Sequence, residues 1–180
     1  MKKVLVLLFC LIFSANLLLS CGTAVSDEEI ISALVQLAPK ARAVYGVVYG
    51  DGLAHGPADD TGYCLVDVEA EYASIAEIKA AIYTVFTPEY GQIIENTAFR
   101  GVETDEGYIG AKFMERDGSL YVNPSATSDF SLPREFDMDT AAVKEKTIYM
   151  AEIVLEHVDG NIEVTLQYMD GKWLIDSPLY

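Results

Sequence analysis

The spacing of the apolar residues changes once along this chain, near residue 100. Before that point they recur about every 3.6 residues, the period of an α-helix with one buried face. After it they alternate with polar residues, the period of a half-buried strand. An Asp-Gly pair between apolar runs is a strong hairpin signal, and three such pairs follow, at 117–118, 159–160 and 170–171. This order predicts an α+β domain whose N-terminal helices pack on a curved antiparallel β-sheet meander.

Capping signals mark where the predicted helices begin. Ser26 and Ser74 are each followed three residues later by a glutamate, which is the pattern of a capping box. Thr87 precedes a proline, and proline is favoured at the first helical position. We expect the first helix to run to about Tyr49 with a kink or break at Pro39. Two consecutive short helices should follow the second and third signals.

The strands are predicted from alternation, with loops where Gly, Asp and Pro gather. In the first strand, Cys64, Val66 and Val68 should share the packed face. A loop is expected before this strand, at 50–62, and a long connection at 124–143, of a length that often has a functional role. The predicted strands cover residues 63–69, 108–115, 120–123, 146–157, 162–169 and 172–176.

The N-terminus predicts export from the cytoplasm. A start with two lysines precedes an apolar run at 4–19, which is short for a membrane-spanning helix. A basic start, a short apolar run and a small residue at its end are typical of a secretory signal peptide. Residues 1–20 are therefore set apart from the fold.

Residues 18–21, Leu-Leu-Ser-Cys, resemble the lipobox of bacterial lipoproteins. In that class the cysteine is alkylated with diacylglycerol and the chain is cut before it. The resemblance implies a lipidated Cys21, an anchor and tether at 21–25, and a single α+β binding domain at 26–180. Such a domain would be extracytoplasmic and attached to the cell membrane through the lipid only. The alternative is an ordinary signal peptide followed by an incidental cysteine.

The charge of the chain limits its partners. Residues 1–20 hold two lysines and no acid, so the net charge of −16 becomes −18 for the remainder. Nucleic acid is a poor partner for such a surface, because phosphates require Lys and Arg. A basic protein would be steered toward it, although acidity also simply maintains solubility.

Motifs for catalysis, metal binding or phosphate binding are absent from the sequence. Cys64, His55 and His157 are the one combination that could form a Cys-His hydrolase. A catalytic thiol is usually activated at a helix N-terminus or beside an imidazolium. Cys64 lies in the middle of a predicted strand, which favours a buried structural thiol. We therefore expect no enzyme, no catalytic residue, no metal and no cofactor.

One acidic segment is a candidate for partner binding. Glu103, Asp105 and Glu106 lie close together and are followed by Tyr108, which could act as an aromatic anchor. The alternative is a solvated connection into the sheet.

Three segments resemble the IseA family of D,L-endopeptidase inhibitors: Tyr72–Tyr90, Arg116–Pro124 and Tyr168–Asp176. Their order and spacing are similar to that family over roughly residues 30–178. The resemblance implies a non-enzymatic protein that binds a cell-wall hydrolase of the NlpC/P60 type and restrains autolysis. The same order of elements resembles NTF2-like and cystatin-like domains, so the alternative is a small-molecule or peptide-binding envelope module with an apolar cavity between helices and sheet.

Overall fold

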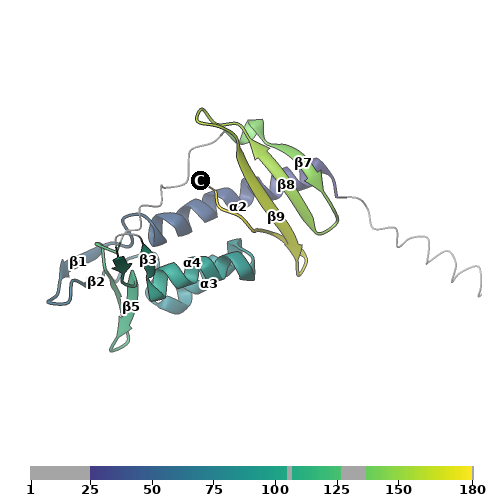
Figure 1. The fold of residues 1–180 in the computed structure, drawn as a ribbon. Helices are drawn as coiled ribbons and strands as arrows, with labels where there is room; N and C mark the ends of the chain where they lie inside the picture. Colours follow the sequence, from purple (N-terminus) through teal and green to yellow (C-terminus); the bar gives the residue numbers. More distant parts are fainter. Residues whose placement is uncertain (1–24, 105–106, 127–136, 180) are drawn as a thin grey trace, which may run out of the picture.

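The computed structural model describes residues 25–104, 107–126 and 137–179 (Figure 1). The expected α+β class is confirmed, with three α-helices and two four-stranded antiparallel sheets among these residues. The strands were expected in one sheet, and their division into two is the main difference from that expectation. The helices are α2 (Asp27–Val48), α3 (Ile75–Val85) and α4 (Pro88–Arg100).

Helix α2 begins where the sequence predicts and ends at Val48, close to the expected end at Tyr49, without interruption. The Ser26 hydroxyl accepts a hydrogen bond from the backbone N–H of Glu29 at 3.1 Å. The predicted break at Pro39 is wrong, because α2 continues through it as one helix. Leu37 and Ala41, on either side of the proline, are buried in the same core cluster. Packing on both sides therefore holds the two halves together despite the missing N–H.

Helices α3 and α4 are the expected consecutive pair. The hydroxyls of Ser74 and Thr87 cap their N-termini, each accepting a backbone N–H at 3.2 Å. The elbow between them is attached to the last strand of the chain. Phe86 forms a parallel bridge with Ile175, and the N–H of Thr87 donates to the Ile175 carbonyl at 2.9 Å.

The first sheet has the order β1-β2-β6-β5. Its strands are β1 (His55–Ala58), β2 (Cys64–Val66), β5 (Phe113–Arg116) and β6 (Ser119–Val122). The edge strand β1 lies within the loop expected at 50–62. It was not anticipated because its His-Gly-Pro-Ala sequence has no apolar alternation.

Strand β2 is shorter than predicted. Cys64 and Val66 are buried as expected, but Val68 is 99% exposed and lies in a turn. The N–H of Asp67 donates to the Ala54 carbonyl, and the N–H of Ala70 donates to the Asp67 carbonyl, which closes a turn. The expectation that Val68 packs is therefore wrong, because the chain leaves the sheet at Asp67.

The second sheet is a simple meander in the order β10-β9-β8-β7. Its strands are β7 (Ala142–Lys146), β8 (Met150–Leu155), β9 (Ile162–Met169) and β10 (Lys172–Ile175). Strand β7 was not predicted as a separate strand. Part of it falls in the connection expected at 124–143, of which residues 127–136 lie outside the described part.

Two of the three Asp-Gly pairs form the expected tight hairpins. Asp117-Gly118 has φ values of 53° and 77°, and Asp170-Gly171 has 50° and 83°. Two successive positive φ angles are the signature of a type I′ turn. Arg116 pairs with Ser119 and Met169 with Lys172, so each turn contains just the Asp-Gly pair. The third pair lies in a longer connection between Leu155 and Ile162.

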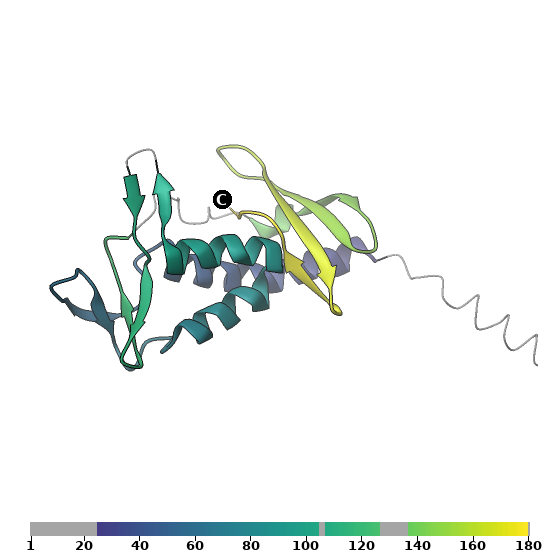
Figure 2. The ribbon, with the colours of Figure 1, turned by 60° about the horizontal axis from the view of Figure 1, so that its bottom comes forward.

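The helices lie between the two sheets, which stand at opposite ends of α2 (Figures 1 and 2). One cluster of buried side chains joins the helices with both sheets. None of the helices in the described ranges has the length and apolarity needed to cross a membrane.

Candidate functional site

The predicted partner-binding segment is a β-hairpin rather than a loop. Strands β3 (Val102–Thr104) and β4 (Gly107–Ile109) pair antiparallel, and Glu103 lies directly opposite Tyr108. The hairpin follows α4 and projects beside the first sheet (Figure 2). Asp105 and Glu106 lie outside the described residues, as does Cys21.

The geometry brings a carboxylate and an aromatic residue to one position of this hairpin. Directly opposite residues of an antiparallel pair have Cβ atoms about 4.5–5.5 Å apart. Glu103 is exposed. Glu103 and Tyr108, two of the residues that the sequence analysis singled out for partner binding, therefore occupy facing register positions of the hairpin.

The nearest lysine in the sequence does not neutralise this surface. Lys112 follows the hairpin, but it is 1% exposed and its ammonium donates to the Gly50 carbonyl. Burial lowers the pKa of Lys112, opposed by the charge of Asp51. No Lys or Arg occurs between Arg100 and Lys112, so the hairpin carries only acidic charge of its own.

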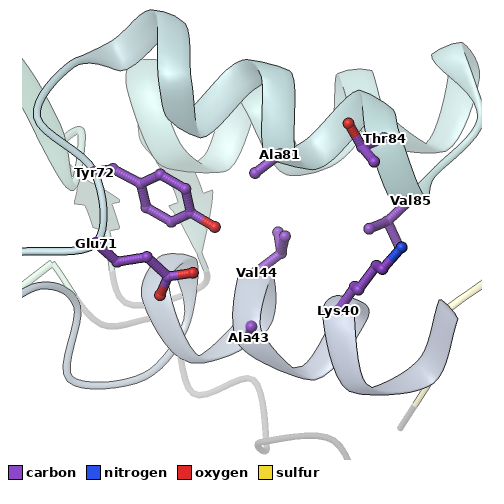
Figure 3. A pocket seen from close by; sticks show the side chains of 8 residues that line it. All are labelled: Lys40, Ala43, Val44, Glu71, Tyr72, Ala81, Thr84 and Val85. Atoms are coloured by element: carbon purple, nitrogen blue, oxygen red, sulfur yellow. The ribbon is translucent and has the colours of Figure 1, made fainter. Parts of the chain in front are cut away.

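A small groove lies between α2 and α3 (Figure 3). Its volume is about 200 Å³. The alternative function, a ligand-binding module, predicted an apolar cavity between helices and sheet, whereas this hollow is between two helices. Its lining combines an apolar floor with polar groups at the rim: Lys40, Ala43, Val44, Glu71, Tyr72, Ala81, Thr84 and Val85.

Tyr72 and the charged residues near it give the groove its polar character. The Tyr72 ring points into the hollow, with Glu71 beside it and Lys40 at the other end (Figure 3). Burial, together with the hydrogen bond and negative charge of Glu71, raises the pKa of Tyr72 to about 12. Tyr72 therefore stays neutral at physiological pH and can offer a ring face or a hydroxyl. Sites for small molecules usually have about 300–1,000 Å³, so the groove would suit a single side chain or small group.

A second hollow, wider and open, lies beside the β8–β9 connection. Its volume is about 490 Å³, and it is lined by Asp137, Thr140, Glu156, His157 and Val158. The N–H of Glu156 donates to the Thr140 hydroxyl at 3.0 Å, which attaches the connection to the 3-10 turn Met138–Thr140.

The structure does not assemble a Cys-His pair of the hydrolase type. Cys64 is 2% exposed on β2 of the first sheet, while His157 follows β8 of the second sheet, at the other end of α2 (Figure 1). His55 is on the strand next to Cys64, but its Nδ1 lies 2.8 Å from the Gly56 carbonyl and its register partner is Val66. Within the described ranges, acidic residues, cysteines and histidines form no group of three that could hold a metal ion.

An ion pair that the sequence did not indicate stiffens the first sheet. The Arg116 guanidinium lies 2.8 Å from an Asp59 carboxylate oxygen and 4.8 Å from the centre of the Tyr121 ring. Hydrogen bonds from Thr61 and Arg116 hold the pKa of Asp59 far below its usual value. This contact ties the β1–β2 connection to the β5–β6 turn, residues separated by more than fifty positions in the chain.

Comparisons of this chain with protein-family models, curated proteins and solved structures found no match.

Proposed function

We propose that this chain is an extracytoplasmic lipoprotein that binds and inhibits NlpC/P60-type peptidoglycan D,L-endopeptidases, restraining autolysis. The proposal combines the lipobox at Cys21 and the resemblance of three segments to the IseA inhibitors. The structural observation that carries it is the projecting acidic hairpin, in which Glu103 lies opposite Tyr108.

A projecting hairpin suits the obstruction of a catalytic cleft. Two paired strands present a narrow edge at little entropic cost, because the ladder already orders their backbone. An aromatic residue supplies the contact area that dominates binding energy at interfaces. The acidic neighbours steer the hairpin toward a basic cleft rim and raise the association rate, which salt then lowers.

The described side chains support binding rather than catalysis. The thiol of Cys64 is buried, and His55 lies on β1 of the first sheet whereas His157 lies in the connection after β8 of the second. We assign no catalytic residue, metal or cofactor to the chain, and its proposed partner is a protein.

The test is a digestion assay with purified peptidoglycan and an NlpC/P60 endopeptidase from the same bacterium. The chain without residues 1–21 is added at increasing concentration, and release of soluble fragments is followed. We expect dose-dependent slowing that weakens as salt is raised from low to physiological strength. Unchanged digestion by every such endopeptidase of that bacterium would contradict the proposal.

A charge-matched pair of variants tests the role of the hairpin. The first carries Glu103→Gln, Asp105→Asn and Glu106→Gln. The second removes the same three charges at scattered exposed positions, through Glu69→Gln, Glu145→Gln and Glu156→Gln. Only the first should lose inhibition, by about tenfold or more, since each rim charge acts mainly on association. An equal loss in both variants would show that total charge, not the hairpin, matters.

The alternative is a small-molecule or peptide-binding envelope module without an inhibitory role. The observation that favours it is the α2–α3 groove, where the Tyr72 ring, Lys40 and Glu71 surround an apolar floor. Its small volume limits such a ligand to one side chain or a comparable group.

A further inference from the structure

Two large apolar side chains are exposed together at one tight turn of the second sheet. Ile148 is 50% and Tyr149 66% exposed, between strands β7 and β8. Turns at such positions normally carry Gly, Asn, Asp or Ser. Burial in the fold does not explain these two residues, because half or more of the surface of each is exposed.

The turn is well ordered by its own hydrogen bonds. The Thr147 hydroxyl accepts the N–H groups of Tyr149 and Met150 at 3.1 and 3.0 Å. The N–H of Thr147 in turn donates to the Met150 carbonyl at 2.7 Å. Ile148 and Tyr149 are therefore presented from a defined backbone. Because their backbone is already ordered, a contact made by these two residues costs little backbone entropy.

A third aromatic residue adjoins the turn. The N–H of Tyr168, near the end of β9, donates to the Tyr149 carbonyl at 2.8 Å. The Tyr168 ring packs edge-on against Trp173, with ring centres 5.3 Å apart, and is 37% exposed. Amphipathic rings of this kind favour the interface between a bilayer and water.

The same turn is attached to the point where the domain begins. The Lys146 ammonium lies 2.6 Å from an Asp27 carboxylate oxygen and donates to the Val25 carbonyl at 2.8 Å. Val25 itself packs against the core cluster. Figure 1 shows the start of α2 beside β7 and β8.

The length of chain before Val25 then limits how far the turn can be from a lipid on Cys21. Four peptide steps separate Cys21 from Val25, and even when fully extended they span at most about 14 Å. The polar headgroup layer of one leaflet is itself about 5–8 Å thick. A domain tethered this closely must rest with its Val25 side on the headgroups.

We propose that the β7–β8 turn is a membrane-contact surface, with Ile148 and Tyr149 lying in the bilayer interface beside the Cys21 lipid. The proposal rests on the lipid anchoring in the proposed function and is independent of hydrolase inhibition. The occupant is the lipid surface rather than a protein, because the tether is too short to admit a folded partner between the domain and the membrane. The acidic first turn of α2, Asp27–Glu29, adjoins the end of β7 through the Asp27–Lys146 contact, and its charge disfavours strongly anionic lipids.

This contact also sets the direction of the rest of the molecule. Helix α2 has 22 residues, or about 33 Å at 1.5 Å per residue. The first sheet and the β3–β4 hairpin stand at its far end (Figures 1 and 2). Contact at the turn therefore points the hairpin away from the membrane, toward the cell wall.

The test uses the lipidated chain reconstituted in phosphatidylcholine vesicles that contain doxyl-labelled lipids. A fluorophore is attached through Ile148→Cys in one variant and Val158→Cys in another. Val158 is the matched control, since it is 94% exposed and lies in the connection beyond the opposite end of strand β8. Cys64 does not interfere with labelling because it is buried.

We expect the lipids to quench the label at 148 at least about twofold more than that at 158, because interfacial side chains reach about 5–10 Å into the headgroup boundary. Equal quenching in chains whose lipid on Cys21 is verified by mass spectrometry would overturn this inference and leave the proposed inhibition intact. Absence of the lipid would overturn this inference and the anchoring together. The peptidoglycan assay without residues 1–21 stays informative about inhibition in either case.

Discussion

Glu115, on strand β5, accepts a hydrogen bond from the backbone N–H of Ile75, 2.8 Å away, at the first position of α3. The two residues are 40 positions apart in the chain. The first-turn N–H groups of a helix have no partner within the helix. A side chain of the first sheet therefore completes the cap of α3 and joins the sheet to the helical layer.

Substitution of Glu115 should destabilise the domain through this cap. We expect Glu115→Ala to lower the free energy of unfolding by about 1–2 kcal/mol, the cost of a lost helix cap. Glu69→Ala, at an exposed turn position, is the control and should change it by less than about 0.5 kcal/mol. Urea denaturation followed by circular dichroism measures both. Equal effects would mean that the Glu115–Ile75 contact contributes nothing specific.

Alanine substitution of two helix glycines should change the stability of the domain in opposite directions. A Cβ at Gly46, in α2, would meet no atom within 4 Å, so Gly46→Ala should stabilise the domain by about 0.5–1 kcal/mol. A Cβ at Gly91, in α4, would lie 2.8 Å from the Tyr83 ring, so Gly91→Ala should destabilise it by about 1–3 kcal/mol. Thermal melting of the two variants compares them directly. Stabilisation by Gly91→Ala would show that α3 and α4 do not approach this closely.

Glu95 should make the domain sensitive to acid. Its carboxylate accepts hydrogen bonds from the Lys79 ammonium and the Tyr83 hydroxyl, each at 2.7 Å, and these lower the pKa of Glu95 in the folded chain. The stabilisation is present above the unfolded pKa of about 4.5 and is lost as pH falls through the folded pKa. Glu95→Gln should therefore show a shallower fall in unfolding free energy between pH 5 and 2. Part of the fall remains because of Asp59. Identical pH profiles for wild type and variant would refute the role of Glu95.

Filling the α2–α3 groove separates the two proposed functions. Ala43 lines the groove and is exposed on α2, so Ala43→Leu should occupy the hollow without disturbing the core. If the chain inhibits through its hairpin, digestion of peptidoglycan should be slowed by this variant as strongly as by wild type. If this variant lost inhibition while its circular dichroism spectrum stayed unchanged, the contact surface would be the groove rather than the hairpin.

The sequence did not predict the α2–α3 groove or the turn at Ile148. Tyr72 lies in a segment singled out for its resemblance, but nothing local places Lys40 across from it. Ile148 and Tyr149 read as members of one continuous strand at 146–157, whereas the hydrogen bonds of Thr147 turn the chain there. Alternation alone does not distinguish a strand residue from an apolar turn residue.

The sequence by itself determined the features whose causes lie within a few residues. The caps at Ser26, Ser74 and Thr87 and the two Asp-Gly turns depend on neighbours three or four positions away, and the structure has them all where they were predicted.

The tertiary structure decided whatever depends on contacts between distant segments. The division of the strands into two sheets, the separation of Cys64 from His157 and the continuity of α2 through Pro39 are of this kind. Each is set by which apolar faces cover one another, and that choice belongs to the whole core rather than to any local pattern.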